Sequence, residues 1–270
     1  MVRRECKNEG MSSSLRYVLA ALLLAVSASA ADSEWHNLFD GKTFAGWVDP
    51  TRKSPPGDSF VIEDGCLKAT RHPRITEDLF SAETYRDFEL EFDWKISPKG
   101  NSGVKYRIQD TVWVPEGADA PRKFEDKVNA GLAHRIRQRP DHGQDYVVGF
   151  EYQITDNAAN SDAIHNGPLH RTAALYDVFA APLDATRPVG EFNHSRIVVK
   201  GDHFEHWLNG QKVVEGSLKA PEVAEAAAKR WGKDSAVYNL LVNQPRRDCP
   251  ISLQNHGDEA WFKNIRIRRL

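Results

Sequence analysis

Apolar and polar residues alternate with a period of two along much of this chain. Over residues 87–96, five apolar residues alternate with five charged ones, and the same period recurs at 102–109 and 149–157. Successive side chains of a strand point to opposite faces, so this period is typical of strands with one face buried. We therefore predict core positions for Phe92, Trp94, Tyr106, Ile154, Val198 and Leu253.

Turn signals divide these segments into short strands. Asp64-Gly65 predicts a hairpin, while Gly201-Asp202 and Asn209-Gly210 divide one apolar stretch into three consecutive antiparallel strands. Residues 172–179 and the last twenty residues predict further strands. Many short strands without a βαβ rhythm predict an all-β sandwich or barrel of antiparallel sheets.

Two segments depart from the strand pattern. Residues 220–233 predict one short peripheral helix, with Pro221 near its start and Gly232 at its end. Residues 110–148 are rich in Pro, Asp, Arg and Gly and show no period, so we expect a long loop with a functional role. No linker divides the rest, which predicts a single β-sandwich domain over residues 31–270.

The N-terminal residues have the pattern of a signal peptide. Arg16 precedes a short apolar run that ends in Ala28-Ser29-Ala30, which predicts a secretory signal over residues 1–30 and export to the periplasm or the extracellular space. The run is too short to favour a membrane span. Cys66 and Cys249 then remain, either as one disulfide or as two buried thiols.

Charge excludes one class of partner. Residues 1–30 hold four of the 36 basic and two of the 38 acidic residues, so the remainder has a net charge near −4. No basic stripe is present, which argues against nucleic acid as a partner.

Two polar rows point to a binding groove. Glu151, Gln153 and Thr155 form the polar face of one predicted strand, and Lys105, Arg107 and Gln109 form that of another. A polar sheet face usually meets only water, but two such rows backed by apolar residues also fit the floor of a groove.

Six segments together resemble one family, the 3-keto-disaccharide hydrolase domain family, once a domain of unknown function. They occur in the order typical of that family and cover most of residues 36–270. The segments are HNLFDGKTFAGW (36–47), YRDFELEFDWKISPKGNSGVKYR (85–107), GFEYQITDN (149–157), TAALYDV (172–178), EFNHSRIVVKGDHFEHWLNGQKVVE (191–215) and ISLQNHGDEAWFKNIRIRRL (251–270). The segment 110–148 is longer than the resemblance leads us to expect, which bears on substrate preference.

The resemblance implies a fold and a reaction. The fold is a jelly-roll sandwich like that of concanavalin A and the glucanases, and the role is carbohydrate breakdown in bacteria. A ketone at C3 of a sugar acidifies the C2 hydrogen, so a base at C2 allows β-elimination of the C1 oxygen, followed by hydration. Such a reaction needs a base, a group that stabilises the enolate, and an acid for the leaving group.

Residue types suggest which side chains fill these roles. Glu151 is the candidate base, because burial in a groove raises the pKa of a carboxylate. Lys105 and Arg107 are candidates to bind the enolate, and the alternative for both is an ion pair with Glu151. The alternative for Glu151 itself is a surface residue on an exposed strand. His256, in a loop between the last strands, is a candidate acid or ligand. The candidate substrate-binding residues are Asn101, Lys105, Arg107, Gln153, Asp156 and Gln254.

The sequence requires no cofactor but allows a divalent metal ion. Glu151, Asp156, His165 and His256 are ligand types, yet none of them has a diagnostic spacing. A glycosidase with two facing carboxylates would need Glu151 with Asp156 or Asp177. A second class of function also stays open, a non-catalytic lectin-like module, which would use some of the seven Trp residues for stacking on sugars. In either class the expected partner is a carbohydrate.

Overall fold

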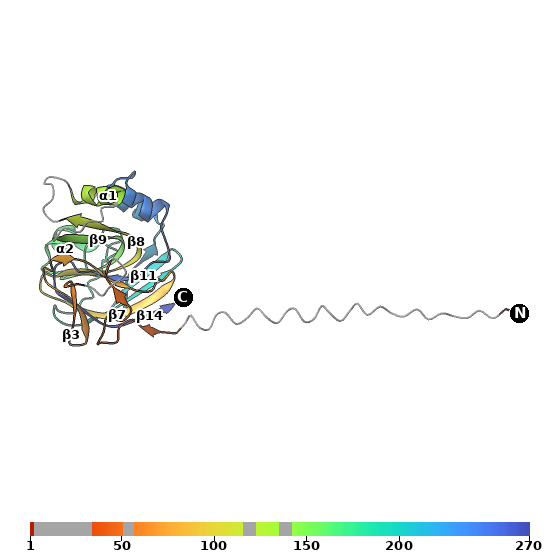
Figure 1. Ribbon diagram of the computed structural model, residues 1–270, viewed down its shortest axis with the longest axis horizontal. Helices are drawn as coiled ribbons and strands as arrows, with labels where there is room; N and C mark the ends of the chain where they lie inside the picture. Colours follow the sequence, from red (N-terminus) through yellow and green to blue (C-terminus); the bar gives the residue numbers. More distant parts are fainter. Residues whose placement is uncertain (3–33, 51–56, 116–122, 135–141) are drawn as a thin grey trace.

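Two β-sheets pack face to face and a layer of helices covers part of one of them (Figure 1). The structure, a computed structural model, describes residues 1–2, 34–50, 57–115, 123–134 and 142–270. The strands are β1 His36–Asn37, β2 Trp47–Val48, β3 Phe60–Glu63, β4 Cys66–Ala69, β5 Ile75–Thr76, β6 Leu79–Ser81, β7 Phe88–Ile96, β8 Asn101–Pro115, β9 Gly143–Thr155, β10 Asn193–Lys200, β11 His203–Leu208, β12 Gln211–Ser217, β13 Ser252–Leu253 and β14 Ala260–Arg269.

The strands divide between an eight-stranded and a six-stranded sheet. The larger has the order β12-β11-β10-β7-β14-β4-β3, with β1 paired to β14, and the smaller has the order β2-β6-β13-β8-β9-β5. The pairs are antiparallel except for β5 with β9, which are parallel. The prediction of an all-β jelly-roll-type sandwich is therefore confirmed, with one parallel pair added.

The alternating strands bury their apolar rows between the sheets. On β7, Phe92 is fully buried and Trp94 is 1% exposed, while the outward Glu91 accepts a hydrogen bond from Arg266 on β14 at 2.8 Å. Five of the six predicted core residues are buried in the cluster between the sheets. The prediction for Val198 is wrong, because Ile197 and Val199 point inward instead.

The predicted turns connect neighbouring strands. Asp64 and Gly65, with φ of 49° and 73°, join β3 to β4, and Asn209 and Gly210, with φ of 49° and 82°, join β11 to β12. Positive φ at both central positions is the requirement of the type I′ turn, whose twist suits a two-residue hairpin. The three consecutive strands β10, β11 and β12 are confirmed.

Helices are more numerous than predicted. The predicted helix is α3, Pro221–Trp231, and it ends at Gly232 as expected. The prediction of only one helix is wrong, because the chain also forms α1 Phe124–His134, α2 Ser161–Asn166, α4 Ala236–Tyr238, the 3-10 turn η1 Gly167–Leu169 and the π-helical turn η2 Asn239–Asn243.

Two segments differ from their predicted structure. Residues 110–148 are not one loop: β8 extends to Pro115, α1 follows, and β9 begins at Gly143. Residues 172–179 form no strand, because Ala173 and Asp177 have positive φ values and break the extended path. This segment instead follows the edge of β9 through three backbone hydrogen bonds, among them Tyr176 N to Glu151 O at 3.0 Å.

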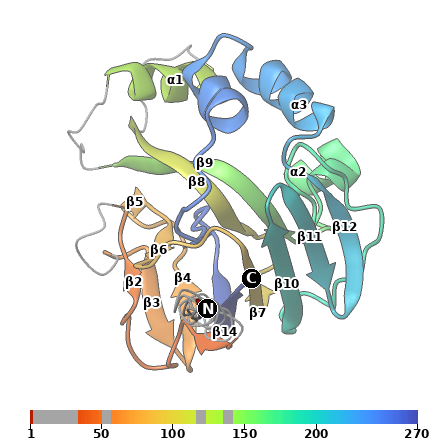
Figure 2. The same cartoon turned by 90° about the vertical axis from the view of Figure 1, so that its right-hand side faces the viewer.

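A second apolar cluster attaches the helices to the six-stranded sheet. Val128 of α1 and Val237 of α4 are fully buried against Val148 of β9, and Trp231 of α3 closes the cluster. Figure 2 shows α1 and α3 above the long β8–β9 arm. The helices thus form a roof over one end of the sheet.

Three sequence predictions about targeting and thiols have different outcomes. Cys66 and Cys249 are both free and buried, so the alternative of two thiols holds. Residues 1–30, predicted to be a signal peptide, fall outside the described part of the chain apart from the first two. Among the helices that the structure describes, none has the length and apolar character needed to cross a membrane.

Candidate active site

A cavity of ≈ 330 Å³ lies between the outer face of the six-stranded sheet and the helical roof. Strands β8 and β9 supply its floor, α1 and α3 its roof, and the loops after β13 and before β10 its walls. The described lining residues are Asn101, Phe124, Gln144, Tyr146, Glu151, Gln153, Tyr176, Arg230, Gln254 and His256.

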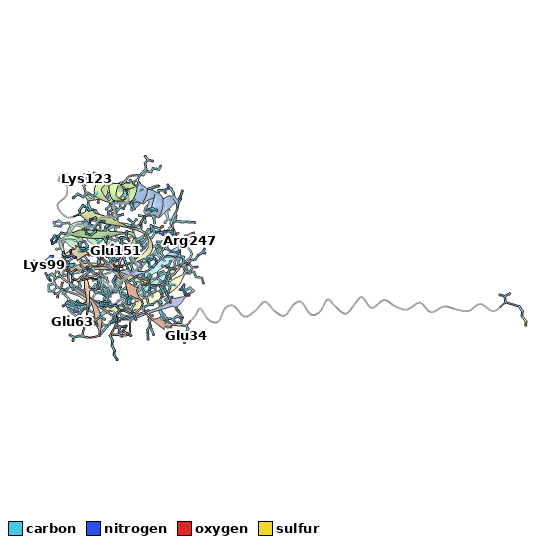
Figure 3. All side chains as sticks on the ribbon, viewed as in Figure 1. Glu34, Glu63, Lys99, Lys123, Glu151 and Arg247 are labelled. Atoms are coloured by element: carbon cyan, nitrogen blue, oxygen red, sulfur yellow. The ribbon has the colours of Figure 1, made fainter. Side chains whose placement is uncertain are left out.

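Glu151 is the carboxylate of this cavity. Glu151, labelled in Figure 3, belongs to β9 and lines the cavity. Its side chain is 14% exposed. The side chain lies over Gly103 of β8, where an added Cβ would come within 2.5 Å of Glu151 Oε1. Since real Cβ contacts do not approach that closely, the position of the carboxylate depends on a glycine in the neighbouring strand.

Buried charges lie beside Glu151. Lys105 Nζ lies 3.8 Å from Glu151 Oε2 and 3.4 Å from Asp78 Oδ2, and both the Lys105 and Asp78 side chains are only 3% exposed. Ser252 Oγ donates to Asp78 at 3.0 Å. A buried charge is stable only when it is paired and hydrogen-bonded, so Lys105 and Asp78 form one structural unit beneath the cavity.

Burial and these charges shift the pKa values of Glu151 and Lys105. Burial raises the pKa of Glu151, and the positive charge of Lys105 opposes that shift only in part. Burial alone would lower the pKa of Lys105, but Asp78 and then Glu151 more than offset it, so Lys105 stays protonated. A carboxylate with a raised pKa is a stronger base than an exposed one, which is the property that proton abstraction needs.

The amide of Gln254 connects the two charges. In the orientation that satisfies both ends, its nitrogen donates to Glu151 Oε1 at 3.3 Å and its oxygen accepts from Lys105 Nζ at 3.0 Å. Gln254 is 5% exposed and lines the cavity. The amide therefore fixes the Glu151 carboxylate relative to Lys105.

The roof contributes a second cation. Arg230 of α3 lines the cavity, and its ion pairs with described residues are long, at 3.7 Å to Glu125 and 4.0 Å to Asp177. Its guanidinium carbon lies 5.6 Å from the centre of the Tyr176 ring. Tyr176 in turn donates its hydroxyl proton to Asp162 at 3.0 Å. Arg230 thus presents positive charge to the cavity opposite the Glu151 side of the floor.

Two amides are placed to bind hydroxyl groups. Asn101 is 8% exposed and its Oδ1 has no hydrogen-bond partner among the described residues. Gln153 is 1% exposed and its Oε1 accepts from the backbone N–H of Ile154 at 3.0 Å, which leaves its amino group toward the cavity. Buried polar atoms are normally satisfied, so the Asn101 oxygen suggests a donor supplied by a ligand.

The structure brings five of the eight predicted site residues to the cavity: Glu151, His256, Asn101, Gln153 and Gln254. Lys105 lies beside Glu151, as its paired residue on β8, and does not line the cavity. His256 lies at the rim of the cavity and keeps part of its surface exposed. Desolvation by the surrounding protein lowers its pKa, and the charge of Lys105 lowers it further. Its imidazole is therefore largely neutral at neutral pH.

The positions predicted for two residues are wrong. A bulge between Tyr106 and Asp110 gives Arg107 a φ of 51° and turns it away, so that it donates to Gly201 O at 2.7 Å and pairs with Asp87 at 3.5 Å. Gln109, in the same predicted polar row, binds the backbone of residue 246 instead.

Asp156 also lies outside the cavity lining. It caps a turn, where its oxygens accept from the backbone N–H groups of Lys99 at 2.8 Å and Ala159 at 3.1 Å. Thr155 likewise donates to the backbone of Gly100 and is not among the residues that line the cavity. The polar row of β9 thus contributes Glu151 and Gln153 but ends before Thr155.

A group of side chains that could hold a metal ion lies elsewhere on the surface. Among the described residues, His203, Glu205 and Glu215 on β11 and β12 are close enough to share an ion. Lys212 already pairs with both carboxylates, at 3.6 Å in the case of Glu205. The metal ligands predicted from sequence do not form such a group, and His165 is exposed with Nδ1 2.6 Å from the carbonyl of Ser161.

Sequence reasoning missed half of the cavity lining. Arg230 lies in a helix that was predicted to be peripheral, and Phe124, Gln144 and Tyr146 lie in the segment predicted as a loop. Tyr176 was assigned to a strand. The one available signal was the unusual length of residues 110–148, which does supply part of the wall.

Comparison with known proteins identifies the family. The 3-keto-alpha-glucoside-1,2-lyase-like domain matches residues 34–268. A 3-keto-disaccharide hydrolase of Bacteroides thetaiotaomicron is 30% identical over 245 residues, which is 86% of this chain and 77% of the relative. A crystal structure from Parabacteroides distasonis, provisionally assigned as a glycosyl hydrolase, matches with a TM-score of 0.63 at 23% identity, over 87% of this chain and 94% of that one.

A second Parabacteroides distasonis structure of the same provisional assignment has a TM-score of 0.56 at 22% identity and covers 88% of this chain and 100% of that one. At this identity the two structures establish the fold, while the sequence matches establish descent. The chain belongs to the 3-keto-alpha-glucoside-1,2-lyase-like domain family.

Proposed function

We propose that this protein cleaves 3-keto-glycosides, including 3-keto-disaccharides, by elimination followed by hydration. One observation carries the proposal: a shielded carboxylate with a raised pKa, Glu151, lies in a cavity that also presents the cation Arg230. Family membership supports the substrate class, because the matched relative is a 3-keto-disaccharide hydrolase.

Glu151 acts as the base in the first step. Its carboxylate takes the proton from C2, and the electron pair of the C2–H bond forms a C2=C3 double bond as the ketone oxygen becomes an enolate. Arg230, the cation that lines the cavity, stabilises this oxygen. Lys105 and Gln254 hold the carboxylate in position, so that no reorientation is needed when the proton moves.

Collapse of the enolate expels the C1 oxygen. The C1–O bond breaks, a C1=C2 double bond forms, and the departing oxygen takes a proton from the water molecule that attacks C1 in the next step. His256 at the rim is placed to hydrogen-bond this oxygen. Water then adds its oxygen to C1 while the proton held by Glu151 returns to C2, which gives a 3-keto-sugar and the free alcohol.

The location of the reaction follows from the sequence pattern. On the interpretation of residues 1–30 as a signal peptide, we propose that the enzyme acts outside the cytoplasm, in the periplasm or beyond. Residues 31–270 would then form the mature domain.

Glu151→Gln tests the role of the base. The substitution keeps shape and hydrogen bonding but removes the basic group, and loss of a general base costs about 10²–10⁴ in rate. We expect kcat on 3-keto-trehalose to fall by that factor while the melting temperature changes little. Released glucose measures the rate.

Three other outcomes would exclude the proposal or its assignment of roles. Full activity of Glu151→Gln would remove the base role, and unfolding of the variant would mark Glu151 as a structural partner of Lys105. A wild-type protein that binds unoxidised sugars but cleaves no glycoside, oxidised or not, would instead be a lectin-like module.

A further inference from the structure

A second, larger cavity continues outward from the candidate active site. It has a volume of ≈ 690 Å³, and Phe124, Gln144 and His256 line both cavities. These three residues therefore mark the border between an inner cavity around Glu151 and an outer cavity. A substrate that crosses this border would place one sugar on each side, with the bond to be cleaved beside His256.

The outer cavity is lined by two cationic side chains and three imidazoles. Its described lining includes Arg74, Lys127, His72, His142 and His256, and no Asp or Glu occurs among the described residues that line it. The acidic residues in the first turn of α1, Glu125 and Asp126, do not line it either. The inner and outer cavities therefore differ in charge, because the inner one holds a carboxylate.

Lys127 is the cation of this cavity with the clearest freedom to bind a ligand. It lies in the first turns of α1, is partly exposed, and takes part in no ion pair within the described parts of the chain. Because its ammonium has no carboxylate partner there, an anionic ligand would not have to displace one. A cleft lined by one sign of charge also raises the local concentration of an oppositely charged substrate.

We propose that the outer cavity binds an anionic group on the leaving-group side of the substrate. The enzyme would then prefer 3-keto-glycosides whose leaving group carries a carboxylate or a phosphate over neutral ones of the same shape. This inference rests on the proposed function, since it assigns the second half of the same substrate.

Matched substrates isolate the charge. The 3-keto forms of 4-carboxyphenyl and 4-carbamoylphenyl α-glucoside have nearly the same shape and differ by one charge. A second pair, 3-keto-trehalose with and without a phosphate on its unoxidised glucose, distinguishes phosphate from carboxylate. The quantity measured is the ratio of kcat/KM for the anionic over the neutral member of each pair.

We expect this ratio to exceed about 5 in the wild type for at least one pair and to fall at least threefold in Lys127→Gln, the size of one partly exposed charge interaction. Lys127→Arg should retain the ratio. Lys229→Gln, which removes an exposed charge from α3 outside both cavities, is the matched control and should also retain it. Raising the salt concentration from 0.01 to about 0.3 M should lower the wild-type ratio, because exposed charges are screened.

Different results would overturn the anion site and the proposed function. Turnover of neutral and anionic substrates at equal kcat/KM, or equal losses for both in Lys127→Gln, would overturn the anion site and leave the proposed function standing. No turnover of any substrate would overturn the proposed function. In that case calorimetric binding of the unoxidised glucoside pair decides the inference: tighter binding of the carboxylate that Lys127→Gln abolishes supports it, and equal binding overturns it.

Discussion

At the scale of single residues, the position of Glu151 depends on the absence of a side chain at Gly103. The carboxylate lies over this glycine, and Lys105 and Gln254 hold it from the other side. Any side chain at residue 103 would occupy the space of the carboxylate. The glycine is therefore part of the site although it carries no reactive group.

Gly103→Ala should lower activity without unfolding the protein. The new Cβ would come within 2.5 Å of Glu151 Oε1, and the carboxylate is the flexible end of a side chain, so it moves rather than the backbone. Displacement of a catalytic group by about 1 Å can cost about 10²-fold in rate. We expect a loss of that order in kcat on a 3-keto-glucoside, with the melting temperature within a few degrees of the wild type. Unchanged kcat would show that the reacting group does not depend on this position.

Residue types predicted the floor of the site better than its surroundings. Glu151 and Gln153 were found because alternation assigns each strand residue to a face, and Asn101 was found because its amide is a type that binds sugar hydroxyls. Arg107 was assigned to the wrong face because a bulge, in which residues 107–109 lie opposite residue 149 alone, interrupts the period of two. Arg230 and Tyr176 come from a helix and a loop, for which alternation gives no direction.

At the scale of elements, the helical roof determines how closed the cavity is. Strands β8 and β9 would present Glu151 to bulk water if α1 and α3 did not cover them. Phe124 of α1 and Arg230 of α3 line the cavity itself, so movement of either helix changes the site directly. The packing of the roof should therefore affect substrate binding.

Val128→Ala tests the roof. Val128 is fully buried between α1 and the sheet, and removal of two methyl groups there should cost about 2 kcal/mol of folding stability. Because the loosened helix carries part of the cavity wall, we expect KM for a 3-keto-glucoside to rise several-fold. Urea unfolding and steady-state kinetics measure the two effects.

Val199→Ala is the matched control for this variant. Val199 is also fully buried, but it lies between the two sheets on β10. It should lose a similar stability while KM stays near the wild-type value. A parallel rise of KM in both variants would mean that global loosening, and not the roof, governs binding.

The strand framework could be predicted because short strands and two-residue turns have local signals, as at Asp64-Gly65 and Asn209-Gly210. The inward row of β10 could not be chosen from sequence, since Ile197, Val198 and Val199 are all apolar and a period of two has no contrast there. Helix α1 was missed because its mixed sequence, FEDKVNAGLAH, has little apolar periodicity and is held by contacts with distant segments.

At the scale of the whole molecule, a polar network crosses the core and joins the two sheets. Tyr152 on β9 and Trp94 on β7 both hydrogen-bond Ser195 Oγ at 2.8 Å. His206 on β11 accepts from Tyr106 on β8 at 3.0 Å, and its Nδ1–H donates to the carbonyl of Ala173 at 2.9 Å. Residue 173 begins the segment that carries Tyr176, so the network also connects the core to the wall of the site.

The buried histidine of this network predicts how stability depends on pH. His206 is fully buried, and burial lowers its pKa to about 4. An unfolded chain binds the proton near pH 6.5, so between about pH 6.5 and 4 the unfolded state takes up a proton that the folded state excludes. The stability that the neutral imidazole provides is present above about pH 6.5 and declines as the pH falls toward 4, by about 3 kcal/mol in total.

Urea unfolding at pH 7 and pH 5 measures this effect by comparing the wild type with His206→Gln. The variant should be less stable than the wild type at pH 7, because it loses a well-placed hydrogen bond. The decrease in its free energy of unfolding from pH 7 to pH 5 should, however, be about 2 kcal/mol smaller than that of the wild type. His170 and His194, whose carboxylate neighbours raise their pKa values against the effect of burial, act in the opposite direction and are common to both proteins, so they cancel in the comparison. Equal losses in the two proteins would mean that His206 titrates alike in the folded and unfolded chains, and the network would then need to tolerate a charged imidazole in the core.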